Sequence, residues 1–178
     1  MIHSITISGK SARFFYLEPT RAAHLQTVIR GLNAGRSLIV STKFRTDLFY
    51  QAAVPDHEAI IKLWSMHVGA ETSALDVSDK LECNGDEQVM NQFFQAVNRI
   101  SGNWHQYKLY QKAITESFLI EPRNPLTLKL LGCDQHLCQL PQVKRKPLVE
   151  ASLDLNAKEE QDTFAMAMRL VGNDLRKN

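Results

Sequence analysis

The feature of the sequence that most constrains its fold is a helical repeat of apolar side chains between residues 86 and 118. The first series is Val89, Phe93, Val97 and Ile100, and its spacings of four, four and three residues place these side chains on one face of a helix. The turn signal Ser101-Gly102-Asn103 then separates it from a second apolar and aromatic series. That series is Trp104, Tyr107, Tyr110, Ile114 and Phe118. We therefore expect two antiparallel helices that bury their facing sides.

The N-terminal third has the patterns of a small sheet packed on one helix. Residues 4–8 alternate between apolar and hydroxyl side chains, as in a strand with one buried face. The aromatic segment 12–17 favours a second strand that pairs back on the first, and residues 37–41 favour a third. Between them, the segment from Thr20 to Leu32 predicts a helix. Its apolar face contains Leu25, Val28, Ile29 and Leu32.

Two more helices are expected before the middle of the chain. Residues 42–53 fit a helix with Phe44, Leu48, Phe49 and Ala52 turned inward. Pro55 suits the first turn of the next helix, and Gly69 ends it. Over residues 70–84 the periodicity fades, so we expect a loop with a short strand near residues 75–77.

The C-terminal part predicts a helix-turn-helix and a final helix. Residues 126–131 and 134–140 fit two short helices separated by Gly132, although Pro141 ends the second one early. Asn156 and Glu159 have the spacing of a capping box at the start of the last helix. Its apolar face is expected to contain Phe164, Met168, Val171 and Leu175.

These patterns predict an α+β fold that is predominantly helical, with a small N-terminal β-sheet or hairpin and a helix, followed by a helical layer. Residues 1–178 are enough for a single domain with a substantial core; the alternative is a basic α/β part, 1–70, and a helical part, 84–178. No apolar run is long enough to cross a bilayer, and the first residues do not resemble a signal peptide. We therefore expect a cytoplasmic protein without membrane contact, whose three cysteines are reduced thiols.

The basic residues are distributed unevenly along the chain. Residues 1–50 contain seven basic and two acidic side chains, a net charge of +5, although the whole chain carries only +2. Such an excess suggests a polyanionic partner, because lysine and arginine side chains release counterions from a phosphate backbone. A solvated face that keeps the protein soluble is the alternative. The candidate nucleic-acid-binding residues are Lys10, Arg13, Arg21, Arg30, Arg36, Lys43 and Arg45, with Lys144, Arg145 and Lys146 as a second cationic run.

Motifs for chemistry are weak throughout the sequence. Cys133, His136 and Cys138 do not have the spacing of a zinc knuckle, and His57 has Ile61 where a zincin helix needs a second histidine. Gly9-Lys10-Ser11 resembles the end of a P-loop, but Ser4 stands where the motif needs its first glycine. We therefore expect no enzyme activity, no metal and no cofactor.

Two hypotheses about function follow. The first is a bacterial DNA-binding regulator of transcription that contacts duplex DNA through its basic N-terminal surface and forms a homo-oligomer such as a homodimer. The second is a structural or adaptor subunit that docks on a protein partner. Binding to a nucleic acid should weaken steeply as salt rises, whereas apolar docking should change little.

Overall fold

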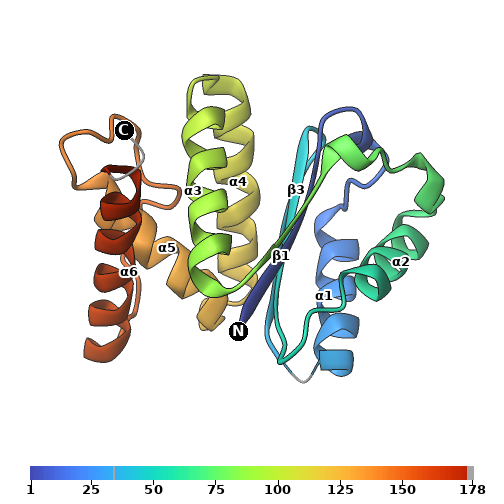
Figure 1. Ribbon diagram of the computed structural model, residues 1–178, viewed down its shortest axis with the longest axis horizontal. Coiled ribbons are helices and arrows are strands. Elements are labelled where there is room, and N and C mark those ends of the chain that lie inside the picture. Colours follow the sequence, from blue (N-terminus) through green and yellow to red (C-terminus); the bar gives the residue numbers. More distant parts are fainter. Residues whose placement is uncertain (34, 176–178) are drawn as a thin grey trace.

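The computed structural model of the protein describes residues 1–33 and 35–175, which form four β-strands and six α-helices (Figure 1). The strands are β1 (Ile2–Ser8), β2 (Ser37–Thr42), β3 (Arg45–Gln51) and β4 (Lys80–Asn84). The helices are α1 (Pro19–Asn33), α2 (His57–Val68), α3 (Asp86–Ser101), α4 (Trp104–Ile120), α5 (Pro125–Cys138) and α6 (Ala157–Leu175). This confirms the predicted α+β fold with its predominance of helices. None of the helices in these described ranges is long and apolar enough to cross a membrane.

The strands form one antiparallel sheet in the order β2-β3-β1-β4. The chain connects β1 to β2 through α1, with β3 between them in the sheet, and it connects β3 to β4 through α2, with β1 between them. Two interlocked β-α-β units of this kind make the ferredoxin-like arrangement. Because that arrangement carries many unrelated functions, it positions a site without specifying its chemistry.

Helices cover both faces of the sheet, and each face has its own apolar cluster. Ile5 and Ile7 of β1 pack with α1 and α2, whereas Ile2 belongs to the cluster formed with α3, α4 and α5. The hydroxyl-bearing Ser4 and Thr6 are buried as well. The expectation that β1 has one solvent-facing side is therefore wrong, because the helical layer lies on that side (Figure 1).

The segment after β1 is not the strand that its aromatic residues predict. It forms a 3-10 turn, Ser11–Arg13, followed by an irregular stretch. Phe15 and Leu17 are nevertheless buried, and side chains satisfy the backbone there: Trp64 Nε1 donates to the Phe15 carbonyl at 2.9 Å, and the Leu17 amide donates to Ser41 Oγ at 2.9 Å. The ring of Phe15 therefore packs edge-on against Trp64 of α2, and the segment does not pair with β1.

The segment predicted as a helix over residues 42–53 is instead β3, the partner of both β1 and β2. Leu48, Phe49 and Tyr50 are consecutive and all buried, because the sheet is covered on both faces. A short apolar run of this kind fits a buried strand as well as a helix. The segment 70–84 also differs from its prediction: the strand there is Lys80–Asn84, after two 3-10 turns, Thr72–Ala74 and Val77–Asp79.

The predicted pair of helices, α3 and α4, is confirmed, with Val89, Phe93, Tyr110 and Ile114 buried, but Trp104, the first residue of the second predicted apolar series, is exposed. The helix-turn-helix is wrong, because α5 continues through Gly132 as one helix. A Cβ atom at Gly132 would lie 2.9 Å from Thr163 Cγ2 of α6, so the glycine permits close packing of two helices and does not mark a turn.

The predicted capping box begins α6: Asn156 Oδ1 accepts hydrogen bonds from the amides of Lys158 and Glu159, and Glu159 Oε2 accepts one from the Asn156 amide. The buried face of the helix is rotated relative to the prediction. Its most buried apolar side chains are Met166, Ala167 and Leu170, whereas Phe164 is about half exposed. The side chain of Leu175 lies outside the described part.

Candidate nucleic-acid interface

Three of the predicted cationic residues lie at one end of the sheet. Ser8 pairs with Arg45 in the ladder between β1 and β3, and Thr42 pairs with Arg45 in the ladder between β2 and β3. The turn after β1 and the turn between β2 and β3 therefore lie together. Lys10 is in the first turn, Arg13 ends the 3-10 turn that follows it, and Lys43 is in the second turn; all three are exposed. We call Lys10, Arg13 and Lys43 the basic end, and none of them forms an ion pair within residues 1–33 and 35–175.

Exposed aromatic side chains accompany the basic end. The Arg13 guanidinium lies 4.7 Å from the centroid of the Phe14 ring, which is about half exposed. Helix α4 runs antiparallel to β2. Tyr110, in the first half of α4, contacts Asp47, whereas Asn124, beyond the end of α4, donates to the carbonyl of Ser37 at the start of β2. The N-terminus of α4, with Trp104 72% exposed, therefore projects toward the basic end (Figure 1). Aromatic rings beside cations can stack on nucleic-acid bases.

Arg45 adjoins the basic end in sequence but is not available to a partner. Its side chain is only 13% exposed, and its Nε and Nη2 atoms each lie 2.7 Å from a carboxylate oxygen of Asp47, which is 1% exposed. Thr6 and Tyr110 also donate hydrogen bonds to that carboxylate, at 2.6 and 2.7 Å. The paired carboxylate raises the pKa of Arg45 against the opposing effect of burial. Arg45 is therefore part of the core that joins the sheet to α4.

The remaining N-terminal cations lie elsewhere. Arg36 precedes β2, so it lies at the opposite end of the sheet from Lys43, and both Arg30 and Arg36 form ion pairs with Glu121. Arg21 is exposed on α1 and donates to the carbonyl of His67 at 3.4 Å. The structure therefore divides the predicted surface, and Glu121 offsets the charge of two of its members.

Within the second cationic run, the middle residue differs from its neighbours. Arg145 Nη2 lies 2.6 Å from Asp134 Oδ1, and these side chains are 6% and 1% exposed. The other oxygen of Asp134 accepts a hydrogen bond from the Leu148 amide at 2.6 Å, so the pair fixes the loop after α5 to that helix. Lys144 and Lys146 are both exposed, but Lys146 Nζ lies 3.3 Å from Glu150 Oε1, so of the two only Lys144 has no ion pair within the described residues.

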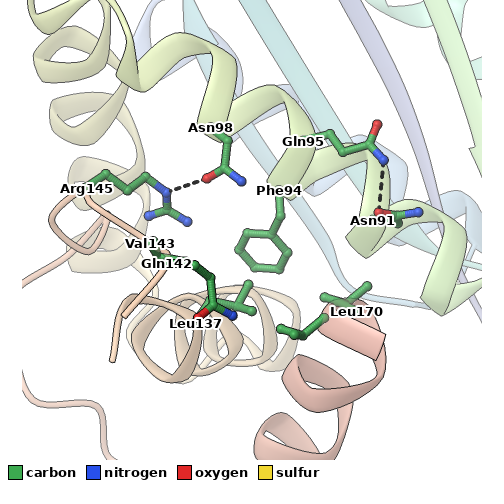
Figure 2. A pocket seen from close by; sticks show the side chains of 10 residues that line it. Asn91, Phe94, Gln95, Asn98, Leu137, Gln142, Val143, Arg145 and Leu170 are labelled. Carbon is green, nitrogen blue, oxygen red and sulfur yellow. Dashed lines mark hydrogen bonds between the residues drawn. The ribbon is translucent and has the colours of Figure 1, made fainter. Parts of the chain in front are cut away.

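A cleft beside Lys144 is lined by the loop after α5 and by α3, α5 and α6 (Figure 2). Its volume is about 250 Å³, and its apolar lining consists of Phe94, Leu137, Val143, Leu170 and Val171. Its polar lining consists of Asn91, Gln95, Asn98, Gln142 and Arg145. A second hollow of about 470 Å³ shares Asn98, Gln142, Val143 and Arg145 with the cleft and is bordered by Lys144.

The sequence interpretation did not include the polar side chains of this cleft. A signal for them exists, because Asn91, Gln95 and Asn98 follow one another at spacings of four and three on α3, which places three carboxamides on one helical face. Asn98 Oδ1 accepts a hydrogen bond from Arg145 Nε at 2.9 Å, and Gln95 Nε2 donates to Asn91 Oδ1 at 3.2 Å (Figure 2). The charge of Arg145 is offset by Asp134, so the apolar part of the cleft has little net charge.

The cysteine and histidine residues considered for a metal have separate partners. Cys133 Sγ donates to the Thr163 carbonyl at 3.3 Å, Cys138 Sγ accepts from Arg145 at 3.2 Å, and His136 Nε2 lies 3.3 Å from Glu160. Over the described ranges, no three metal-binding side chains come together.

A second polar cluster joins β1, β3, β4 and α2. Asn84 Oδ1 lies 2.8 Å from His3 Nδ1 and 2.9 Å from His57 Nε2, and His57 Nδ1 lies 3.0 Å from the Tyr50 hydroxyl. Tyr50 in turn accepts a hydrogen bond from the Asp56 amide. The Tyr50 hydroxyl can then donate to His57 Nδ1, which leaves the proton of neutral His57 on Nε2, facing Asn84. Both ring nitrogens of His57 are thus engaged within the fold.

Burial lowers the pKa of His57 below its ordinary value, against the opposing effect of the hydrogen bond to Asn84. The unfolded chain therefore binds the His57 proton more readily than the folded chain. The contribution of neutral His57 to stability is fully present above the ordinary pKa, about 6.5, and is lost progressively as pH falls from there through the lower pKa of the folded protein. We expect acidification from about pH 7.5 to pH 5.5 to lower the free energy of unfolding less in the His57→Gln variant than in the parent. Urea titrations at each pH measure both values. Equal losses in the two proteins would contradict this assignment.

Comparison with known proteins gives no family for the chain. The sequence matches no protein-family model, and no related protein was found among curated sequences.

Proposed function

We propose that this protein binds duplex DNA without catalysing a reaction and that it regulates transcription by occupying the DNA. The observation that supports this best is the basic end, where Lys10, Arg13 and Lys43 are exposed and free of ion pairs in the described part of the chain. Exposed cations of this kind gain free energy by displacing counterions from phosphates. The exposed ring of Phe14, next to Arg13, offers an apolar contact to sugars and bases beside them.

The proposed mode of binding is contact with the phosphate backbone. Since α5 is one continuous helix, the recognition helix that a helix-turn-helix would insert into the major groove is not formed by this segment. Contacts with phosphates position a protein on DNA but carry little sequence information. The protein should therefore bind many duplex sequences with similar affinity.

The test is a triple variant, Lys10→Ala with Arg13→Ala and Lys43→Ala, in a fluorescence polarisation assay with random duplex DNA. We expect its affinity at low salt to fall by about tenfold or more, and the slope of log affinity against log salt to flatten by about 2 to 3, because each lost contact contributes about 0.9. The melting temperature should hardly change, because these side chains are exposed.

A matched control is Lys112→Ala with Lys158→Ala and Arg169→Ala, which removes three exposed cations from α4 and α6. This control should bind DNA like the parent. If the parent binds neither DNA nor RNA at low salt, or if both triple variants lose affinity equally, the proposal fails.

A structural or adaptor subunit is the alternative. The observation that favours it is a pair of consecutive exposed apolar residues, Leu119 and Ile120, at the end of α4. Ile120 borders a hollow that also contains Ala23 and Thr27 of α1. Docking of a protein partner on these residues would be weakened by Leu119→Ser with Ile120→Ser and would change little with salt.

A further inference from the structure

The two edges of the sheet differ in whether their backbone groups are satisfied. At the β2 edge, residues 37, 39 and 41 point their backbone groups outward, because the Gln51 amide donates to the Arg36 carbonyl and so fixes the alternation of the ladder. The Ser37 carbonyl accepts hydrogen bonds from the side chains of Gln26 and Asn124, and the Ile39 carbonyl accepts one from Ser117. Side chains from both helical layers therefore satisfy two of the outward carbonyls of this edge.

The β4 edge is open. The Gly85 amide donates to the Ile2 carbonyl, so residues 81 and 83 bond to β1 while residues 80, 82 and 84 point their backbone groups outward. Within the described residues, the backbone amide and carbonyl of Glu82 have no backbone partner on that side. The carbonyl of Lys80 has none either. The Lys80 amide is used by the preceding turn, where it donates to Val77. In Figure 1, β4 runs along the front of the sheet and no helix crosses it. An open edge of this kind can accept another strand.

The side chains of β4 complement those of a second, antiparallel β4. Lys80 and Glu82 lie on one face of the strand, where their charged groups are 2.7 Å apart, and Leu81 lies on the other face with 42% of its surface exposed. If a twofold axis passes between two copies of Leu81, each Lys80 faces the Glu82 of the other copy and each Leu81 faces its own equivalent. In that register each Glu82 amide can donate to the Lys80 carbonyl of the other copy. A shift of two residues would place the two Glu82 carboxylates opposite each other, which is unfavourable.

From this complementarity we propose that the protein forms a homodimer through antiparallel pairing of β4 with β4 of a second copy, centred on Leu81. The two four-stranded sheets then join into one continuous eight-stranded sheet. The interface is isologous, because the same short strand serves both copies. Val77, which is exposed beside this edge, adds apolar surface near the junction.

The experiment uses two charge reversals, Lys80→Glu and Glu82→Lys, and sedimentation analysis of the full chain over a range of concentrations. Each variant alone places like charges opposite each other twice in the dimer, so we expect each to dimerise at least about tenfold more weakly than the parent. An equimolar mixture of the two variants restores opposite charges at both positions. We therefore expect the mixture to form a heterodimer at concentrations at which each variant alone is monomeric.

Mixing the two variants distinguishes charge pairing across the interface from the ion pair within each chain. Both variants lose their own pair between residues 80 and 82, and mixing cannot restore it. A control that reverses an exposed pair on α4, Lys112→Glu with Glu116→Lys, should dimerise like the parent, because this pair is on a different element from β4. The proposal is overturned if the parent stays monomeric at the highest soluble concentration, if either single variant dimerises like the parent, or if the mixture gives no heterodimer.

Discussion

Replacing Arg45 with alanine should lower the free energy of unfolding by about 3–5 kcal/mol, although a surface arginine would contribute almost nothing. The guanidinium is nearly buried and holds both oxygens of the buried Asp47 carboxylate. Its removal leaves that carboxylate with only the hydroxyl donors of Thr6 and Tyr110. An ionised group without its counterion in a dry core is among the most destabilising defects that one substitution makes. Urea unfolding followed by circular dichroism measures the loss.

Two further variants distinguish the loss of stability caused by breaking this ion pair from the loss caused by removing any positive charge. Lys43→Ala removes an exposed cation from the same hairpin and should change stability by less than about 0.5 kcal/mol. Tyr110→Phe removes one hydrogen bond to the carboxylate and should cost about 1.5–3 kcal/mol. An Arg45→Ala variant as stable as Lys43→Ala would show that the Arg45 side chain is not held in the core.

The helices were largely predictable because their apolar faces repeat over four or five turns. In α3, Val89, Phe93, Val97 and Ile100 leave no other consistent interpretation of the segment, and all four are buried. The error at β3 has the opposite origin. Its run Leu48-Phe49-Tyr50 is short and buried on both faces, and apolar spacing alone does not separate such a strand from a helix.

The functional assignment of single cations was not predictable from local sequence. Lys43 and Arg45 are two residues apart, yet one is exposed and the other is bonded to a network that includes Tyr110, which is far away in the sequence. Lys144 and Arg145 differ in the same way, because Asp134 reaches only the second of them. Which cation is buried depends on which one a distant acidic residue reaches in the folded chain. A count of charges therefore predicts that a surface is basic, but it does not predict which basic residues are exposed on it.

The open β4 edge was equally hidden from the sequence. Residues 80–84 lie in a segment whose weak periodicity predicted a loop, and only the ladder with β1 shows which backbone groups face outward. Once the ladder is known, the alternation of Lys80, Leu81 and Glu82 becomes informative. These residues keep the edge polar on one face, as protected edges often are, while remaining complementary to their own copy.

Replacing Phe93 with alanine should lower the free energy of unfolding by about 3–5 kcal/mol, because its side chain fills the space between α3, α4 and the sheet. Its ring centroid lies 5.5 Å from that of Phe49 on β3, 5.0 Å from that of Phe94 and 6.5 Å from that of Tyr110. The surrounding helix and strand are fixed by their own hydrogen bonds, so the structure can collapse only partly into the cavity.

The matched control is Phe164→Ala on α6. This ring is about half exposed and its nearest aromatic neighbour is His136, at 5.4 Å between ring centroids. Its removal should cost less than about 1 kcal/mol, because it already contacts water and leaves no enclosed cavity. Both substitutions delete the same atoms from a helix, so the difference between them measures burial alone. A loss below about 1 kcal/mol for Phe93→Ala would mean that α3 does not pack on the sheet through this face.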